Sequence, residues 1–338
     1  MKSIAGVISP LIRPVYGGLG SILMFHRVCP PSGKRPVPGA SSIEYSPERF
    51  ESMLDHIQDR GYQFLSLDEI HDGLINRNIN RKFVAITFDD GYEDNLTIAY
   101  PILKKRRIPF TIYITTSFPD GDAILWWYLL EDLLNRDKKI RVVEGQSATE
   151  YDLSDPKQRN LASFTIRKIM KSSHPSNFKG SIHNIFITNG LDPKSKVKDL
   201  ALSWEQILDL SKDPLVTIGA HTVNHYLLKQ LEEEQAVKEI VDARAKLASK
   251  LRQPVDHFAY PFGGKLAAGE REFRLVKELG FKTATTTRTA NIFLAHANHL
   301  TALPRLDMGM FSTSEELTLA LDGYIPARMN HFQRVVTL

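Results

Sequence analysis

The stretch FVAITFDDGYEDN, residues 83–95, joins an apolar run to two adjacent carboxylates. Its first six residues are apolar or β-branched, which is typical of a strand buried on both faces of a parallel sheet. Asp89, Asp90 and Gly91 follow directly, and Asp-Gly is a common turn pair. Two interpretations are open: a turn in which one carboxylate caps the next helix, or a metal and proton-transfer site. The stretch on its own favours the turn.

The chain on both sides of this stretch alternates apolar runs of strand length with helical patterns. Strands are expected at 21–28, 62–66, 82–88, 110–116, 215–220, 255–260, 281–287 and 303–308. Helices are expected at 47–60, 68–77, 95–106, 232–251, 269–280 and 313–322. This alternation predicts an α/β fold with about seven parallel strands. Periodicity leaves two architectures open, a (β/α) barrel and an open parallel sheet.

One long segment breaks the alternation. Residues 120–202 contain WWYLLEDLL (126–134), followed by polar and basic stretches without strand alternation, and they predict a mostly helical insertion. The expected organisation is an N-terminal arm at 1–20, a main domain at 21–325 that carries the insertion, and a C-terminal tail at 326–338.

Composition excludes several classes of protein. The 338-residue chain has 43 Lys and Arg against 39 Asp and Glu, an excess too small to indicate nucleic acid binding. Cys29 is the one cysteine, so no intrachain disulfide can form. The N-terminus does not resemble an export signal, and no run approaches the ~18 apolar residues of a membrane span. We expect a cytoplasmic protein with at most a peripheral membrane contact, through residues 4–16.

Candidate site residues stand where several of the expected strands end. They are His26, Asp89-Asp90, His221 and His225, Pro261 to Gly264, and Arg305 with Asp307. In parallel α/β folds the carboxyl ends of the strands meet on one side of the sheet, where the site forms. We therefore expect these residues to lie close together.

The histidine pair and the aspartate pair together predict a metal site. The i,i+4 spacing of His221 and His225 places both imidazoles on one side of a helical turn. Two imidazoles and one carboxylate suit Zn²⁺ and also accept Co²⁺, Ni²⁺ or Mn²⁺. The second carboxylate can take a proton from a water whose pKa the cation lowers. The reaction class that follows is metal-assisted hydrolysis of a carbonyl compound.

Three motifs resemble those of the polysaccharide deacetylase, or NodB-homology, family of carbohydrate esterases. They are TFDDG (87–91), HTVNH (221–225) and YPFGG (260–264). The resemblance implies a distorted (β/α) barrel and the removal of acetyl groups from N-acetylated, sometimes O-acetylated, sugars. By position, it makes Asp89 the general base and Asp90, His221 and His225 the metal ligands. It also assigns the backbone N–H of Phe262 to the oxyanion, beside the metal.

Two departures from the family pattern stand out. Ala259 occupies the position where the third motif often has an arginine that orients the base, and we hypothesise that Arg305 supplies this charge, held by Asp307. The late Leu-x-His motif, whose histidine acts as general acid, is not found cleanly. The candidates for that role are His26, His296 and His299, and His26 is preferred because it stands at a strand end.

The expected function is the metal-dependent removal of N-acetyl or other acyl groups from an amino sugar. The substrate would be an N-acetylated carbohydrate: a polysaccharide, a chitin-like oligosaccharide or a lipid-linked glycan precursor. The alternative is a catalytically weak carbohydrate-binding protein that keeps the fold, which the two departures favour. The intact set of Asp89, Asp90, His221 and His225 argues against that alternative, because a binding module does not need it.

Overall fold

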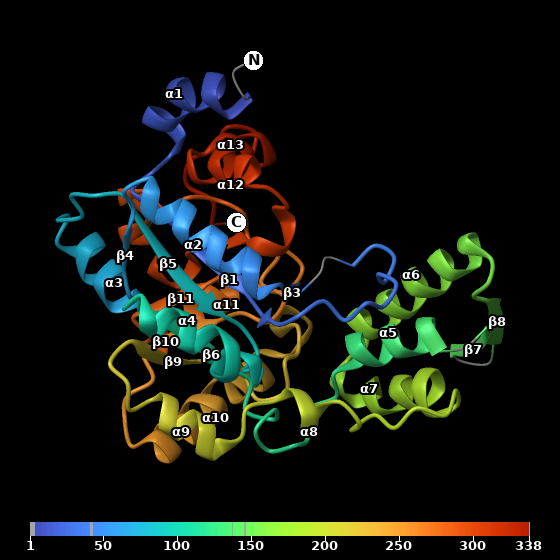
Figure 1. Ribbon diagram of the computed structural model, residues 1–338. Helices are drawn as coiled ribbons and strands as arrows, with labels where there is room; N and C mark the ends of the chain where they lie inside the picture. The colour runs from blue at the N-terminus through green and yellow to red at the C-terminus, as the bar shows by residue number, and fades with distance from the viewer. Residues whose placement is uncertain (1–3, 41–42, 137, 145–146, 338) are drawn as a thin grey trace. The chain divides into compact units, whose positions relative to one another are not determined.

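The computed structural model describes residues 4–40, 43–136, 138–144 and 147–337 (Figure 1). The chain divides into two compact units. The barrel unit comprises Met1–Pro31, Ile43–Thr116 and Leu202–Leu338, and the insertion unit comprises Ser32–Ser42 and Ser117–Ala201. Residues 1–3 of the expected N-terminal arm and residue 338 of the expected tail lie outside the described residues.

The barrel unit is built on a parallel sheet. Its strands are β1 (Gly20–Phe25), β4 (Gln63–Phe64), β5 (Phe83–Phe88), β6 (Phe110–Ile114), β9 (Val216–Ala220), β10 (His257–Ala259), β11 (Thr283–Thr285) and β12 (Leu306–Asp307). The order is β11-β10-β9-β6-β5-β1-β12, with the short β4 paired to β5. A parallel bridge between Thr285 and Leu303 sets the chain just before β12 against β11. The sheet therefore curls into a barrel, which confirms the predicted fold class and excludes the open sheet.

Helices return the chain between the strands. They are α1 (Ile4–Tyr16), α2 (Pro47–Asp59), α3 (Leu67–Ile75), α4 (Tyr100–Lys105), α9 (Trp204–Leu210), α10 (Glu233–Leu251), α11 (Glu270–Glu278), α12 (Ser314–Leu321) and α13 (Tyr324–Met329). Short elements accompany them: β2 (Arg27–Val28), β3 (Glu44–Tyr45), η1 (Asn95–Ala99), η3 (Leu228–Gln230), η4 (Leu294–Asn298), η5 (Leu300–Ala302) and η6 (Met308–Met310). Local sequence sets the helix starts. The Ser46 side chain accepts the Arg49 N–H at the start of α2, as a capping serine does.

Strand β5 shows how the sheet sorts its side chains. Val84, Ile86 and Phe88 pack in the large apolar core cluster, which also holds buried residues of α2, α9, α10 and α12. Phe83 and Ala85 belong to a second cluster, with Ile22, Tyr113, Ala259 and Leu303 from other strands. Side chains alternate between the two faces of a strand. Thr87 and Asp89 therefore continue the second face, which is the interior of the barrel.

The insertion unit is mostly helical but contains a β-hairpin that the sequence analysis missed. Its elements are α5 (Trp126–Arg136), β7 (Lys139–Glu144), β8 (Ser147–Asp152), α6 (Pro156–Ser172), α7 (Pro175–Ile182), η2 (His183–Ile187) and α8 (Val197–Leu200). The antiparallel pair β7-β8 buries Ile140 and Val142 on one strand and leaves most of its other side chains exposed. Because so few positions are apolar, the alternation of a strand is weak in this part of the sequence.

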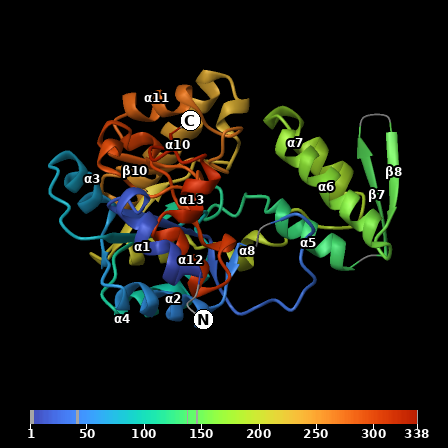
Figure 2. The same cartoon turned by 90° about the horizontal axis from the view of Figure 1, so that it is seen from above.

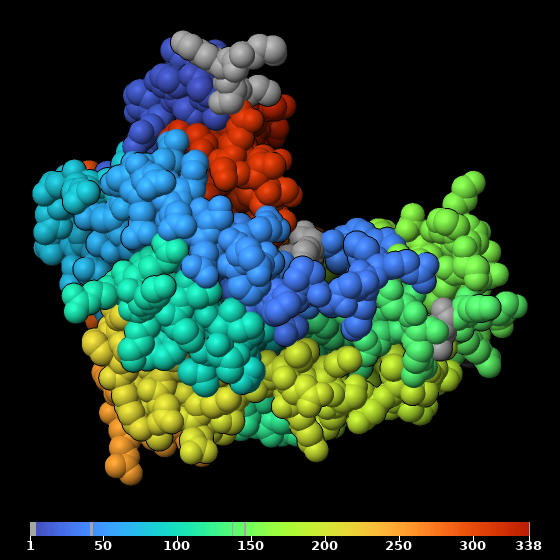
Figure 3. Space-filling model, in the orientation of Figure 1, coloured from blue at the N-terminus to red at the C-terminus, as the bar shows by residue number. Residues whose placement is uncertain are grey.

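The two ends of the described chain pack on one another. Helix α1 lies beside α12 and α13, as seen in Figure 2 and on the surface in Figure 3, where α1 is blue and the C-terminal helices are red. The Tyr16 and Phe332 rings are 5.8 Å apart. Helix α13 begins just before residue 326, so the expected C-terminal tail starts inside a helix. Within the described residues, none of the helices has the length and apolar character needed to cross a bilayer.

Candidate active site

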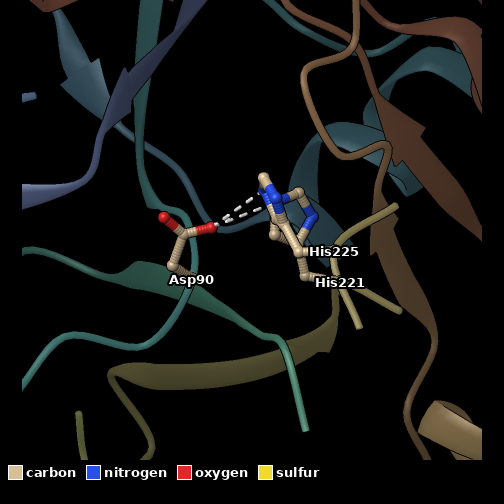
Figure 4. Close-up of side chains that lie close together, drawn as sticks. All are labelled: Asp90, His221 and His225. Atoms are coloured by element: carbon tan, nitrogen blue, oxygen red, sulfur yellow. Dashed lines mark ion pairs between the residues drawn. The ribbon is translucent and has the colours of Figure 1, made fainter. Parts of the chain in front are cut away.

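Asp90, His221 and His225 converge at the carboxyl ends of β5 and β9. Their ligand atoms all lie within 4.8 Å of one another. Figure 4 shows the Asp90 carboxylate pointing at both imidazoles, and the Nε2 atoms of His221 and His225 lie 3.4 and 3.3 Å from Asp90 Oδ1. The structure thus brings together the three residues that the sequence analysis named as metal ligands.

The backbone at the end of β5 separates the two aspartates. Asp90 has φ 76° and Gly91 has φ 95°, so two consecutive residues are left-handed. This conformation is costly for an aspartate and normal for glycine. A Cβ on Gly91 would also lie only 2.8 Å from Ile114 Cδ1. The turn therefore sends Asp89 into the barrel interior and Asp90 toward the histidines.

The histidine segment is a loop, so the predicted helical turn at 221–225 is wrong. Thr222 and His225 have φ 65° and 60°, which no α-helix contains. The Thr222 hydroxyl accepts the His225 N–H at 3.0 Å, so the left-handed residues, rather than a 3.6-residue repeat, bring the imidazoles together.

Glu239 of α10 holds the same loop, and the sequence analysis did not identify it. Its carboxylate accepts hydrogen bonds from the Val223 N–H at 3.0 Å and from the Asn224 N–H at 2.8 Å. It also accepts one from the Asn224 amide at 2.6 Å. A glutamate on an amphipathic helix is so common that its position in the sequence gave no usable signal.

Hydrogen bonding sets which nitrogen of His221 is available. Its Nδ1 lies 2.7 Å from the carbonyl oxygen of Ala259. A carbonyl can only accept, so Nδ1 carries the hydrogen and donates it, and in the neutral ring Nε2 presents a lone pair toward Asp90. Ala259, at the position where the family often has an arginine, thus contributes its backbone to the site.

Asp89 forms a buried ion pair with Arg305. The guanidinium donates from both terminal nitrogens, at 2.6 and 2.7 Å, to the two carboxylate oxygens of Asp89. Arg305 is fully buried. Burial by itself raises the pKa of Asp89, but Arg305 outweighs this effect and the pKa lies below its usual value. Asp89 is therefore ionised at neutral pH and held in one orientation.

The remaining contacts of Arg305 differ in part from the hypothesis. The Thr286 carbonyl accepts from Nε at 3.0 Å, and the Thr87 hydroxyl accepts from a terminal nitrogen at 3.2 Å. The Asp307 carboxylate instead accepts the Gly309 N–H at 2.9 Å, at the start of η6. Arg305 is thus positioned by two strand ends and by Asp89, because the β12 turn directs Asp307 to its own backbone.

Phe262 lies against the ligand cluster. Its ring centroid is 4.7 Å from that of His225. Phe262 and Gly263 have φ 59° and 54°, so the Pro-Phe-Gly-Gly segment turns sharply beside His225. The Thr287 hydroxyl donates to the Phe262 carbonyl at 2.7 Å and holds this turn. The role of the Phe262 N–H toward an oxyanion stays a prediction.

His26 stands at the end of β1, on the same side of the barrel. Strands β1 and β5 pair in parallel with Phe25 opposite Phe88, so His26 and Asp89 leave the sheet side by side. The side-chain amide of Asn95 donates to the His26 carbonyl at 2.9 Å. Asp94 accepts from Arg27 at 2.6 Å and from the Val28 N–H at 3.2 Å. Asp94 and Asn95 thus hold the turn after β1, and the Asp94 side chain makes no capping hydrogen bond at the start of η1.

The other two candidates for the general acid lie elsewhere. The segment that carries His296 and His299 follows Ile292, which bridges Gly20 at the amino end of β1, and η4 packs on α3. Burial lowers the pKa of His296 to about 4, so it is neutral at pH 7. Of the three histidines, only His26 reaches the carboxyl end of the barrel.

The cluster fits a divalent cation. Asp90 Oδ1 is buried and has no hydrogen-bond partner among the described residues. An unsatisfied buried carboxylate oxygen costs free energy unless a cation or a donor meets it. Burial raises the pKa of Asp90, but His225 and His221, when they carry a proton on Nε2, outweigh this effect and hold it well below its usual value, so the oxygen is anionic. Two imidazoles and one carboxylate are a ligand set that Zn²⁺ and similar ions accept.

Known proteins share both sequence and fold with this chain. The family model described as polysaccharide deacetylase matches residues 76–142 and 151–284, more than half of the chain. YxkH of Bacillus subtilis is 35% identical over 94 residues, which cover 28% of this chain and 30% of that protein. The poly-beta-1,6-N-acetyl-D-glucosamine N-deacetylase of Staphylococcus aureus is 27% identical over 134 residues, which cover 40% and 44%. The matched stretches span less than half of either relative.

Solved structures share the fold over most of the chain. Streptococcus pyogenes deacetylase PplD superimposes with a TM-score of 0.58 at 21% identity, over 89% of this chain and 97% of that one. IcaB from Ammonifex degensii gives 0.56 at 19% identity, over 91% and 98%. At these identities the structures establish the fold, while the family model establishes the membership. The chain belongs to the polysaccharide deacetylase family.

Proposed function

We propose that this protein is a metal-dependent hydrolase that removes N-acetyl groups from an amino sugar within a glycan, and that residues 21–325 form its deacetylase domain. The observation that carries the proposal is the cluster of Asp90, His221 and His225, whose ligand atoms lie within 4.8 Å of one another. The Asp89 carboxylate, which follows the same strand, is ionised and oriented by Arg305.

Asp89 acts as the general base in this proposal. It removes a proton from the attacking water, and Arg305 keeps its carboxylate charged and pointed in one direction. The low pKa that Arg305 imposes also makes Asp89 a weak base. A cation held by Asp90, His221 and His225 would compensate for the weak basicity of Asp89, because it would lower the pKa of the attacking water and polarise the substrate carbonyl.

Two further groups complete the proposed site. The backbone N–H of Phe262 donates a hydrogen bond to the oxyanion that forms from the amide carbonyl. His26 donates a proton to the leaving amine, which must be protonated before the C–N bond breaks. His26 suits this role because it comes from a different strand end than Asp89, so acid and base approach from separate elements.

The substrate class follows from the relatives. The Staphylococcus aureus relatives are named poly-beta-1,6-N-acetyl-D-glucosamine N-deacetylases, and their substrate is an N-acetylated amino sugar polymer. We propose an N-acetylglucosamine-type glycan for this chain as well. The alternative, a catalytically weak carbohydrate-binding protein, drew support from the missing arginine at Ala259. Arg305 removes that support, because it delivers a guanidinium to both oxygens of Asp89.

The test measures acetate release from N-acetylglucosamine oligomers by protein freed of metal and then supplied with Zn²⁺ or Co²⁺. We expect release that depends on the added cation and disappears in Asp89→Asn. Asp209→Asn, on the exposed face of α9, serves as the matched control and should keep full activity. Tight glycan binding without release of any acyl group would establish the alternative and refute the hydrolase.

A further inference from the structure

Helix α1 presents its apolar side to solvent. Among the residues of α1 whose burial is described, those that are exposed are Gly6, Val7, Pro10, Leu11, Pro14 and Val15. Val7, Leu11 and Val15 are 55%, 75% and 45% exposed and follow one another at helical i,i+4 spacing. The face toward solvent therefore carries no charged or hydrogen-bonding side chain.

The face of α1 toward the barrel is the more polar one. Ser9 is buried on this side, and the Arg13 side chain lies 3.5 Å from Asp322. Beneath the helix is a cavity of about 600 Å³, lined by Ser9, Arg13, His56, Arg60, Glu315 and Asp322 among others. A surface helix normally turns its apolar stripe to the core and its polar side to water. In α1 this arrangement is inverted.

The apolar surface continues onto the C-terminal segment. The Phe332 ring contacts that of Tyr16 at the end of α1, and Phe332 and Met329 are 55% and 48% exposed. Residues 1–20 and 323–338 together contain four Lys or Arg and no Asp or Glu. Arg328 and Arg334 are both exposed there. Arg328 and Arg334 thus place positive charge next to Met329 and Phe332 along the chain, whereas Arg13 pairs with Asp322 and the exposed Glu315 accepts the Ala5 N–H at the start of α1.

We propose that the stripe of Val7, Leu11 and Val15, with Met329 and Phe332, docks this protein onto an anionic lipid bilayer. A helix that lies in the membrane interface buries an apolar face at the boundary of headgroups and acyl chains. Basic residues beside it are attracted to the surface potential of anionic lipids. The positive charge of the terminal segments favours an anionic bilayer over an uncharged apolar partner. The inference goes beyond the proposed deacetylase activity, because it concerns where the protein works.

The test is flotation of the whole protein with vesicles, without substrate. The vesicles are phosphatidylcholine with about one third phosphatidylglycerol, compared with pure phosphatidylcholine. We expect binding to the anionic vesicles, weakened by high salt. The variant Val7→Ser/Leu11→Ser/Val15→Ser should bind at least about tenfold less, because three apolar side chains no longer enter the interface. Arg328→Gln and Arg334→Gln should each lower binding about fivefold.

The matched control changes three exposed apolar residues on other helices. In Ile75→Ser/Leu208→Ser/Val241→Ser the original side chains are 53%, 39% and 37% exposed, and vesicle binding should be unchanged. Thermal unfolding of each variant checks that the fold is retained. Equal binding by the stripe variant and the control, or no binding by the unaltered protein, would overturn the proposal. Loss of a dimer in the stripe variant, without vesicle binding, would also overturn it and assign the stripe to self-association.

Discussion

Both ends of the barrel bury a histidine beside an aspartate, yet the two pairs are built differently. At the amino end, His257 lies 3.5 Å from Asp68, whose side chain is 49% exposed and also pairs with Lys282 at 2.7 Å. At the carboxyl end, Asp90 is 3% exposed and faces two imidazoles. The charge of Asp68 is thus balanced by lysine and water, whereas one oxygen of Asp90 is left without a hydrogen bond. A buried His–Asp contact is therefore not diagnostic of a site by itself; what distinguishes Asp90 is a buried anionic oxygen with no hydrogen-bond partner among the described residues.

The largest expected effect tests this contrast directly. Asp90→Asn removes the anionic ligand, so cation binding should be lost and deacetylation should fall by on the order of a thousandfold or more. Asp68→Asn makes the same chemical change at the amino end and should leave activity within about twofold. Calorimetric titration with Zn²⁺ and initial rates measure the two effects. Equal losses of Zn²⁺ binding and activity in both variants would show that the two His–Asp pairs do not differ in function.

Arg305 tests whether the base depends on its buried partner. In Arg305→Ala the Asp89 carboxylate loses its orientation, and we expect a loss of about a hundredfold in kcat/KM. Arg305→Lys should recover little, because lysine cannot bond both carboxylate oxygens in parallel. Activity within a few-fold of the unaltered protein in Arg305→Ala would exclude the orienting role.

Measurements of unfolding free energy distinguish the orienting role of Arg305 from a purely structural role. A buried carboxylate without a partner should lower the free energy of unfolding by about 3–5 kcal/mol in Arg305→Ala. Asp89→Asn/Arg305→Met removes both charges, and it should regain most of that stability while remaining inactive. Urea unfolding followed by circular dichroism measures the difference. A double variant that is both stable and active would show that neither charge serves the reaction.

His26 gives a smaller and more specific effect. His26→Gln should slow amide hydrolysis about tenfold to a hundredfold, because an amine leaves only when protonated. Hydrolysis of 4-nitrophenyl acetate should hardly change, since its leaving group needs no proton. His296→Gln, at the opposite end of the barrel, should alter neither rate. Equal slowing of both substrates in His26→Gln would assign His26 to binding or structure.

The smallest effect concerns stability at the amino end. His257 and then Lys282 outweigh burial and lower the pKa of the Asp68 carboxyl. A lowered pKa in the folded state contributes stability that is present above the unfolded pKa and is lost as pH falls. Asp68→Asn should therefore cost no more than about 1 kcal/mol at pH 7, and the difference should begin to shrink near pH 4 and vanish only when the pH falls below the lowered pKa of Asp68. A stability difference between the unaltered protein and Asp68→Asn that grows as the pH falls would contradict a lowered pKa of Asp68 in the folded state.

Much of the fold and the central residues of the candidate site could be predicted from the sequence. Apolar runs such as 83–88 and 110–114 coincide with strands because burial on both faces leaves an unbroken pattern. Asp90 and His221 were singled out because they stand at the ends of such runs, and His225 because of its spacing from His221. The β7-β8 hairpin was missed because it buries few side chains, and Glu239 because its role depends on a loop that folds back on α10.

The local geometry of the site was beyond sequence reasoning. The spacing of His221 and His225 indicated a helical turn, but left-handed residues at Thr222 and His225 produce the convergence. Such conformations are set by tertiary contacts, since neither residue favours positive φ. Asp307 was expected to hold Arg305, but its hydrogen bond goes to the Gly309 N–H in the turn after β12.

The pairing of Asp89 with Arg305 has a consequence for how the protein matures. The two residues are 216 positions apart, and Arg305 follows directly after the bridge that closes the barrel. A nascent chain that has emerged only to residue 300 contains Asp90, His221, His225 and Asp89 but not Arg305, which pairs with Asp89 in the folded protein. Contacts between such distant residues form late in folding. In the proposed mechanism, the base is therefore oriented only once β12 has joined the barrel.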